Sequence, residues 1–214
     1  KALELNSDII VKIDGDGQMD TKNINKLITP ILKGQADYTK GNRFHSPDNL
    51  STMPKIRLMG NLLLSFASKM SSGYWRIFDP TNGFTAIHGK VLKELPLDKI
   101  SKDYFFESDM LFRLNITRAV VCDIPMKAIY ADETSNLKIS KILIPFARKH
   151  IINFFKRITY NYFIRDFSIA SIELIASILL ILFGVFFGSQ EWLISSQTGV
   201  PATAGTVIIA ALPI

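Results

Sequence analysis

Residues 9–18 read IIVKIDGDGQ, and this stretch decides the fold class. The apolar run predicts a buried strand over residues 8–13, and Asp14, Asp16 and Gln18 follow at its end. Ligand sites of α/β proteins gather where the strands of a parallel sheet end, so these side chains are expected at such an edge. Carboxylates there offer hard oxygen ligands to a divalent cation. The stretch therefore predicts a site for a metal-bound diphosphate.

Three other interpretations compete for the same residues. A calcium-binding EF-hand loop that starts at Asp14 is excluded, because Gln18, Met19 and Asn25 stand at its fifth, sixth and twelfth positions. A haloacid-dehalogenase-like phosphatase, with the first aspartate as nucleophile, fits less well because its motif has threonine or valine in place of Gln18. A polar turn that only satisfies backbone groups stays open for so short a motif.

The segments that follow alternate between helix and strand. The order strand, helix, strand at the start is typical of a parallel sheet in an α/β domain. A long polar connection at residues 41–53 and a turn at residues 79–84, DPTNGF, interrupt the regular elements. The expected helices cover about 21–33, 54–72, 89–95 and 107–117, and the further expected strands cover about 36–40, 85–88 and 119–126.

The most apolar segment is residues 167–187, FSIASIELIASILLILFGVFF, with Glu173 as its one ionisable side chain. At ~1.5 Å per residue, its roughly 21 residues match the ~30 Å hydrocarbon core of a bilayer. A second apolar run at residues 203–214 is too short to span one. We expect a transmembrane helix over 167–188, the start of a truncated second one over 203–214, and a chain cut at both ends.

Many of the basic residues behind the formal net charge of +6 lie just before this apolar segment. Residues 142–166 predict a helix with one apolar and one polar face. The apolar face holds Ile144, Ala147, Ile151, Phe155, Ile158 and Tyr162, and the polar face holds Lys149, Asn153 and Arg157. This pattern favours a helix on an anionic membrane surface, and a core-facing helix with a solvated basic face is the alternative. Nucleic acid is not an expected partner.

Two features indicate the compartment of the domain. Residues 189–201 contain no lysine or arginine, so the positive charge before residue 167 places the domain on the cytoplasmic side. The single cysteine, Cys122, excludes an internal disulfide and agrees with a reducing compartment. Separately, the three histidines have no spacing typical of metal ligands, so they are not expected to bind a metal. We expect a multi-pass protein of the cell (inner) membrane.

Five motifs occur in order before the apolar segment: DGDGQ, KGNRF, FDPTNGFTAI, FFESDML and IPMKAIYADETSNLKISK. Together they resemble the family 2 glycosyltransferases of GT-A (Rossmann-like) fold, and specifically the polyprenyl-phosphate glycosyltransferases that include dolichol-phosphate mannosyltransferase. The resemblance implies that residues 1–141 are the C-terminal part of a GT-A domain. Residues 142–166 would then be a juxtamembrane helix, and the part of the domain that holds the nucleotide base would precede this chain.

The resemblance also assigns roles to individual residues. It implies that Asp14, Asp16 and Gln18 bind the nucleotide sugar, with Asp16 and Gln18 as ligands of Mg²⁺ or Mn²⁺. It implies that Arg43, Arg57 and Lys141 bind the phosphate of a polyprenyl lipid, and that Asp79, Glu107 and Asp109 are catalytic. One departure affects the acceptor side, because residues 130–140 lack the arginine that the family has there and carry Asp132 and Glu133.

The expected function is transfer of a sugar from a nucleotide sugar to a polyprenyl phosphate on the cytoplasmic leaflet. Two alternatives stay open, namely transfer to a hydroxyl of a lipid-linked glycan and a noncatalytic membrane scaffold with a degraded GT-A half. The membrane, the nucleotide sugar and the lipid phosphate are the expected partners, and self-association is a further expectation. The 214-residue chain alone is expected to be inactive.

Overall fold

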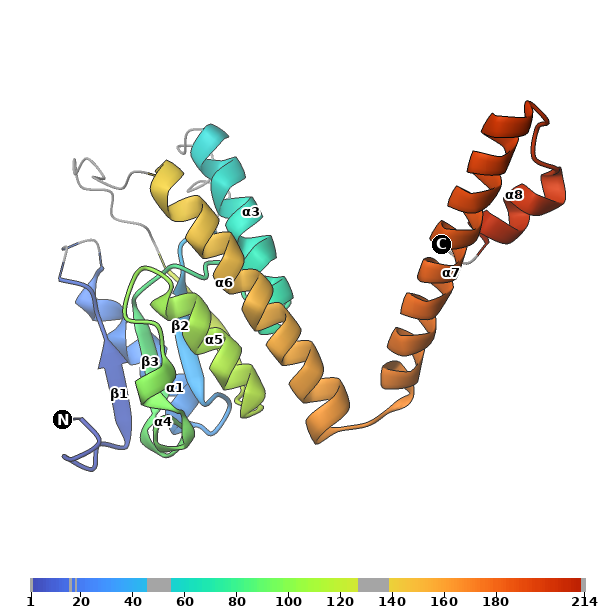
Figure 1. Ribbon diagram of the computed structural model, residues 1–214. Coiled ribbons are helices and arrows are strands. Elements are labelled where there is room, and N and C mark those ends of the chain that lie inside the picture. The colour runs from blue at the N-terminus through green and yellow to red at the C-terminus, as the bar shows by residue number, and fades with distance from the viewer. Residues whose placement is uncertain (1, 16, 18, 46–54, 127–138, 213–214) are drawn as a thin grey trace. The chain divides into compact units, whose positions relative to one another are not determined.

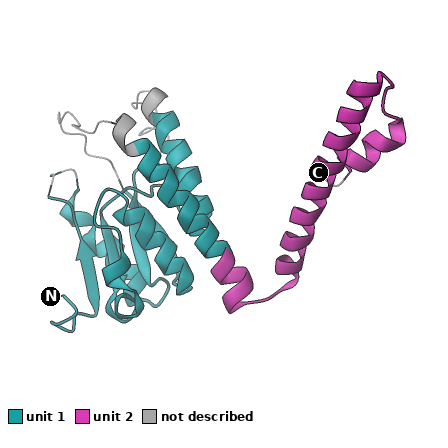
Figure 2. Ribbon diagram, in the orientation of Figure 1, with its two compact units in different colours: residues 1–158 teal, residues 159–214 magenta. Residues whose placement is uncertain are grey.

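The computed structural model describes residues 2–15, 17, 19–45, 55–126 and 139–212, with backbone alone at 55–57 and 139–142. The chain forms two compact units, Lys1–Ile158 and Thr159–Ile214 (Figure 2). Unit 1 holds a mixed α/β sheet with its helices, and unit 2 is helical. The predicted α/β class of the first part is therefore confirmed.

The sheet of unit 1 has four strands in the order β1-β3-β2-β4. They are β1 (Ile9–Lys12), β2 (Tyr38–Asn42), β3 (Thr85–His88) and β4 (Val121–Pro125). Strands β2 and β4 are parallel, whereas β3 lies antiparallel between β1 and β2. The prediction of a parallel sheet is therefore wrong for β3, although β1 and β2 do run in the same direction.

The path of the chain explains the reversal of β3. Helix α3 (Lys55–Ser72) is followed by residues 74–78. This segment lies beside β4 and runs parallel to it. The Tyr74 hydroxyl donates to the carbonyl of Ala119, ahead of β4, over 2.6 Å, and the Phe78 amide donates to Asp123, within β4, over 3.0 Å. The chain thus reaches the edge where β2 and β4 end before it enters β3, so β3 has to run back.

Helices cover both faces of the sheet (Figure 1). A 3₁₀ turn, Thr21–Asn23, and α1 (Ile24–Leu32) lie on one face, where Leu27 and Ile31 pack against Phe84 and Ala86. Helices α4 (Gly89–Glu94) and α5 (Phe106–Ile116) lie on the other, where Leu111 and Leu114 pack around Tyr38 and Ile87. A second 3₁₀ turn, Leu97–Lys99, joins α4 to the segment before α5. Alternation along β3 thus sends Ala86 and Ile87 into two separate cores.

Helices α3 and α6 (Ile139–Thr159) lie side by side in unit 1 and contact each other through polar groups (Figure 1). Ser71 on α3 hydrogen-bonds His150 on α6 over 2.7 Å, and Arg157 donates to the carbonyl of Met70 over 3.0 Å. Nine large apolar side chains of the two helices are exposed instead. They are Met59, Leu62, Leu63 and Phe66 on α3, and Leu143, Ile144, Ile151, Ile152 and Phe155 on α6.

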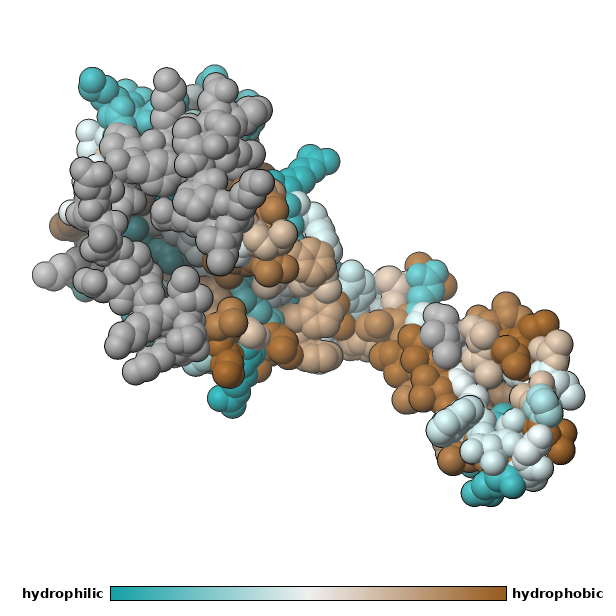
Figure 3. Space-filling model, turned by 90° about the horizontal axis from the view of Figure 1, so that it is seen from above, coloured by the Kyte–Doolittle hydropathy of each residue, from teal (hydrophilic) through white to brown (hydrophobic). Residues whose placement is uncertain are grey.

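We call these nine side chains the outward apolar face. They give unit 1 an unusual distribution of polarity, with apolar groups outside and polar groups inside. The inner sides of the two helices carry buried Ser65, Ser68, His150, Asn153 and Arg157. The core-facing alternative for α6, with its apolar side inward and its basic side in water, is therefore wrong. Figure 3 shows brown, hydrophobic residues on this part of the surface of unit 1.

Unit 2 consists of a π-helical turn, Tyr160–Arg165, followed by α7 (Ile169–Thr198) and α8 (Ala204–Ala211). Ser168 and Ser171 form a capping box at the start of α7, and Gly199 ends it with a φ of 68°. Helix α7 runs about ten residues beyond the predicted 167–188 segment. Within the described ranges, it is the one helix long and apolar enough to cross a membrane.

Candidate functional site

The antiparallel β3 brings several motifs to one edge of the sheet. Thr85, the first residue of β3, pairs with Lys12 near the end of β1 and with Lys40 on β2. The turn at residues 79–84 therefore leads into β3 at the edge where β1, β2 and β4 end. The loop that starts at Asp14 and the residue after β2, Arg43, lie at the same edge.

The Asp14 loop and the turn contact each other directly. A β-carbon at Gly83 would overlap the carboxylate of Asp14, so the present position of that carboxylate requires glycine here. Lys12 donates to Asp14 over 2.6 Å and to Glu107, at the start of α5, over 3.0 Å. The Asp14 side chain is 42% exposed, which leaves it accessible to a ligand. Three segments distant in sequence thus meet around one accessible carboxylate.

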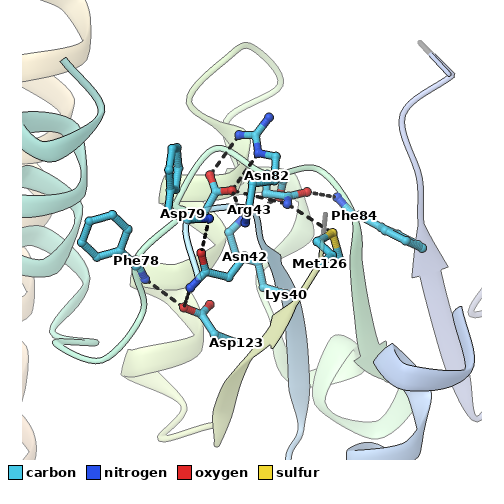
Figure 4. Close-up of polar contacts among 10 residues, drawn as sticks. Lys40, Asn42, Arg43, Phe78, Asp79, Asn82, Phe84, Asp123 and Met126 are labelled. Atoms are coloured by element: carbon cyan, nitrogen blue, oxygen red, sulfur yellow. Dashed lines mark hydrogen bonds and ion pairs between the residues drawn. The ribbon is translucent and has the colours of Figure 1, made fainter. Parts of the chain in front are cut away.

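Arg43 and Asp79 form an ion pair beside this contact (Figure 4). The arginine donates from Nε over 2.8 Å and from a terminal nitrogen over 3.0 Å, and its backbone amide also donates to Asp79 over 3.1 Å. The Asp79 side chain is wholly buried, whereas that of Arg43 is 26% exposed. Asp79 therefore holds Arg43 in place at the edge of the sheet. This geometry favours a positioning role for Asp79 over the catalytic role that the sequence suggested.

Glu107 and Asp109 lie on different sides of α5. Glu107 contacts Lys12 at the sheet edge. The buried Asp109 accepts hydrogen bonds from Ser101, Arg113 and Asn153, over 2.9, 3.0 and 2.9 Å. These bonds join α5 to α6, so the geometry favours a structural role for Asp109 and leaves Glu107 as the carboxylate near Asp14.

Comparison with protein families identifies the domain that carries this edge. The model of the glycosyl transferase family 2 domain matches residues 3–96, which include the Asp14 loop, Arg43 and the turn. This segment belongs to glycosyl transferase family 2. The resemblance seen in the sequence motifs is thereby confirmed.

Two curated relatives match the chain beyond the family 2 segment. The UDP-N-acetylglucosamine–dolichyl-phosphate N-acetylglucosaminyltransferase of Methanococcus voltae is 33% identical over 132 residues, which are 62% of this chain and 52% of that protein. An uncharacterised protein of Methanocaldococcus jannaschii is 28% identical over 124 residues, covering 58% and 51%. The chain thus spans about half the length of the curated relatives it matches.

Solved structures share the fold of part of this chain. Glucosyl-3-phosphoglycerate synthase from Mycobacterium tuberculosis, in complex with Mn²⁺, UDP-glucose and phosphoglyceric acid, superimposes with a TM-score of 0.50 at 17% identity. The match covers 73% of this chain and 51% of that one. The same enzyme with phosphoglyceric acid alone also gives a TM-score of 0.50 at 17% identity. Both comparisons concern the fold.

Four residues assigned to the family 2 site are not placed by this geometry. Asp16 and Gln18 lie outside the described residues, and the side chains of Arg57 and Lys141 do as well. Among the residues that are described, no group of three or more His, Cys, Asp and Glu side chains is arranged to hold a metal ion. The assignment of Asp16 and Gln18 as metal ligands therefore stays a prediction.

Sequence reasoning missed three polar residues beneath the edge of this family 2 domain (Figure 4). Asp123 on β4 accepts from the side chain of Asn42 and the amide of Phe78, each over 3.0 Å. Burial raises the pKa of Asp123 to about 6. Lys40 on β2 is fully buried, and burial lowers its pKa to about 8. A charged residue inside a strand with buried neighbours was the signal that could have identified Lys40.

Proposed function

We propose that the protein containing this chain transfers a sugar from a nucleotide sugar to a polyprenyl phosphate at a membrane. The observation that carries this proposal is the approach of Gly83 to Asp14 at the edge where Arg43 also lies. It combines a carboxylate loop suited to a metal-bound diphosphate with a guanidinium suited to a phosphate. A donor and an acceptor that both carry phosphate need this combination.

On the donor side, Asp16 and Gln18 would hold Mg²⁺ or Mn²⁺, and Asp14 would lie against the nucleotide. Asp14 is accessible, as contact with the nucleotide requires. The side-chain oxygens of Asp16 and Gln18 suit either cation, because both cations prefer oxygen ligands. When bound, the cation supplies positive charge to the departing nucleoside diphosphate. Support comes from the solved relative that is described with Mn²⁺ and UDP-glucose.

On the acceptor side, Arg43, Arg57 and Lys141 would bind the lipid phosphate. Asp79 engages Arg43 through Nε and one terminal nitrogen, which fixes the plane of the guanidinium. A phosphate acceptor is already anionic, so this reaction requires no strong general base. The Methanococcus voltae relative, named for dolichyl phosphate, supports this class of acceptor.

The distribution of polarity in unit 1 supports attachment to a membrane. The outward apolar face of α3 and α6 suits contact with lipid, and α6 leads along the chain towards α7. At ~1.5 Å per residue, a helix of 30 residues is ~45 Å long, about the thickness of a bilayer with its headgroups. We place the domain on the cytoplasmic side of a multi-pass inner-membrane protein.

The test is an assay of the full-length protein, purified in detergent, with Mn²⁺ or Mg²⁺. Labelled UDP-sugars, UDP-N-acetylglucosamine among them, are supplied with a polyprenyl phosphate. We expect a labelled polyprenyl-phosphate sugar, strong loss of product in Asp14→Asn, and no loss in Asp98→Asn, an exposed carboxylate on the turn Leu97–Lys99. Absence of any sugar transfer or nucleotide binding would instead favour the noncatalytic scaffold.

One observation favours a second candidate, transfer to a hydroxyl of a lipid-linked glycan. Lys12 forms ion pairs with both Asp14 and Glu107. It therefore holds the Glu107 carboxylate near the loop that starts at Asp14, which we call the donor loop. A hydroxyl acceptor needs a base for its proton. In that case Glu107→Gln abolishes turnover with a lipid-linked glycan, whereas the polyprenyl-phosphate reaction would retain most of its rate.

A further inference from the structure

Lys40 is the one lysine that the structure buries completely among its described residues. It extends from β2 beneath the turn at residues 79–84, where its Nζ donates to the backbone carbonyl of Asn82 (Figure 4). The next residue of the turn, Gly83, is the one that touches Asp14. Lys40 is thus connected to the donor loop through two consecutive residues of the turn.

The surroundings of Lys40 are rich in charge. Its charged form is favoured by Asp79 on the turn, Glu107 on α5 and Asp123 on β4, and it is disfavoured by Arg43. One carboxylate oxygen of Asp123 is buried without a hydrogen-bond partner among the described residues. Asp79 raises the pKa of Asp123, whereas Lys40 lowers it. The ammonium of Lys40 therefore offsets the repulsion between two buried carboxylates.

We propose that Lys40 is a positioning residue of the donor site, whose ammonium holds the turn at residues 79–84 against the Asp14 loop. The inference rests on the proposed function, since it concerns binding of the nucleotide sugar. A hydrogen bond from an ammonium is stronger than one from a neutral amine, and it also places a positive charge between Asp79 and Asp123. Removing that charge loosens the turn and with it the donor site.

The position of Lys40 gives donor binding and stability opposite responses to alkaline pH. Burial lowers the pKa of Lys40 from 10.5 to about 8, so the ammonium is lost as the pH rises through 8. Donor affinity should then fall. Between about pH 8 and 10.5 the unfolded chain binds the proton that the folded chain has released, so this group makes the folded state more stable as the pH rises. An alkaline loss of affinity caused only by unfolding would show both quantities falling together.

The first experiment compares Lys40→Met with Lys93→Met, an exposed lysine on α4, in the full-length protein. We expect Lys40→Met to raise the KM for the nucleotide sugar about tenfold, in line with loss of one charge-assisted hydrogen bond. The KM for the lipid should change much less, because Asp79 keeps its three hydrogen bonds to Arg43. Lys93→Met should change neither. Equal effects of Lys40→Met on both KM values would overturn the proposal.

The second experiment follows Mn²⁺-dependent UDP binding and the melting temperature from pH 6.5 to 10. Asp123→Asn removes a charge that raises the pKa of Lys40, so the alkaline fall in affinity should move to lower pH. In Lys40→Arg, which keeps its charge, the fall should disappear. An alkaline fall unchanged in both variants would overturn the proposal.

Failure of the proposed function has a different signature. If the wild-type protein binds no UDP at any pH, the glycosyltransferase proposal fails. The stability readout still reports on Lys40 in that case. The stability difference between wild type and Lys40→Met should shift in favour of wild type above pH 8, and a constant difference would contradict the titration of Lys40.

Discussion

At the residue scale, Gly83 is the position at which the donor loop is most sensitive to a small change. A β-carbon there would overlap the Asp14 carboxylate, so Gly83→Ala has to move that carboxylate from its present position. We expect nucleotide-sugar affinity to fall about tenfold or more, corresponding to at least ~1.4 kcal/mol. Titration calorimetry with the full-length protein measures this change.

Gly60→Ala is the matched control for that substitution. Gly60 lies on α3, and nothing stands within 4 Å of the β-carbon that alanine would add. Alanine is the better helix former by about 1 kcal/mol, so a slight rise in melting temperature and unchanged affinity are expected. Unchanged affinity in Gly83→Ala as well would refute the role of the close approach.

Arg43 gives a prediction for the other substrate. In Arg43→Lys the charge stays but the two-pronged contact with Asp79 is lost, and under the proposed function the lipid phosphate would lose a planar partner. We expect the KM for the lipid acceptor to rise about tenfold or more, with donor affinity little changed. Arg148→Lys, at an exposed position of α6, serves as the control. A change confined to the nucleotide sugar would assign Arg43 to the donor.

Sequence motifs identified the residues of this edge but could not pair them. Arg43 and Asp79 were assigned to separate tasks, yet they form one ion pair. Glu107 and Asp109 were treated as equivalent, although their side chains point to different neighbours. Which partner a charged side chain meets depends on helix rotation and strand order, and neither follows from a short motif.

At the element scale, the contact between α3 and α6 depends on a neutral histidine. Burial lowers the pKa of His150 from 6.5 to about 4, so the folded chain binds fewer protons than the unfolded chain between these values. The stability that this group contributes is complete above about pH 6.5 and is lost as the pH falls towards 4. We therefore expect the melting temperature to fall over this interval.

Two variants test this source of acid sensitivity. His150→Gln should lower the melting temperature at pH 7, because the bond to Ser71 changes, but its loss of stability on acidification should be smaller than in wild type. His45→Gln, at an exposed histidine, should keep the wild-type slope. Equal slopes in all three proteins would show that another group governs the acid response.

Element positions followed from the sequence better than element directions did. The strand expected at residues 85–88 is β3 with the same bounds, because its apolar residues stand between clear turn signals. Its antiparallel direction depends on the segment at residues 74–78, whose path is fixed by contacts with β4. The two-sided pattern of α6 was likewise recognisable, whereas the burial of its polar side depends on polar partners on α3 and α5.

At the scale of the whole molecule, the proposed orientation of α7 across a membrane can be tested. Residues before α7 include Arg148, Lys156 and Arg165, whereas residues 189–201 contain no lysine or arginine. We expect Gln197→Cys, near the C-terminal end of α7 and in a Cys122→Ser background, to react with a membrane-impermeant thiol reagent on intact cells. Labelling that requires permeabilised cells would reverse the orientation.

The insertion of β3 between β1 and β2 determines when the sheet can be completed during synthesis. Residue 9 pairs with residue 88, so β1 has to wait for about 80 further residues, on the order of several seconds at about 5–20 residues per second. Strand β4 then follows, and the sheet is complete in sequence before α7 begins at Ile169. A substitution that slows pairing of β1 with β3 would therefore leave an unfinished sheet, with exposed strand edges, at the time when the apolar helix α7 is made.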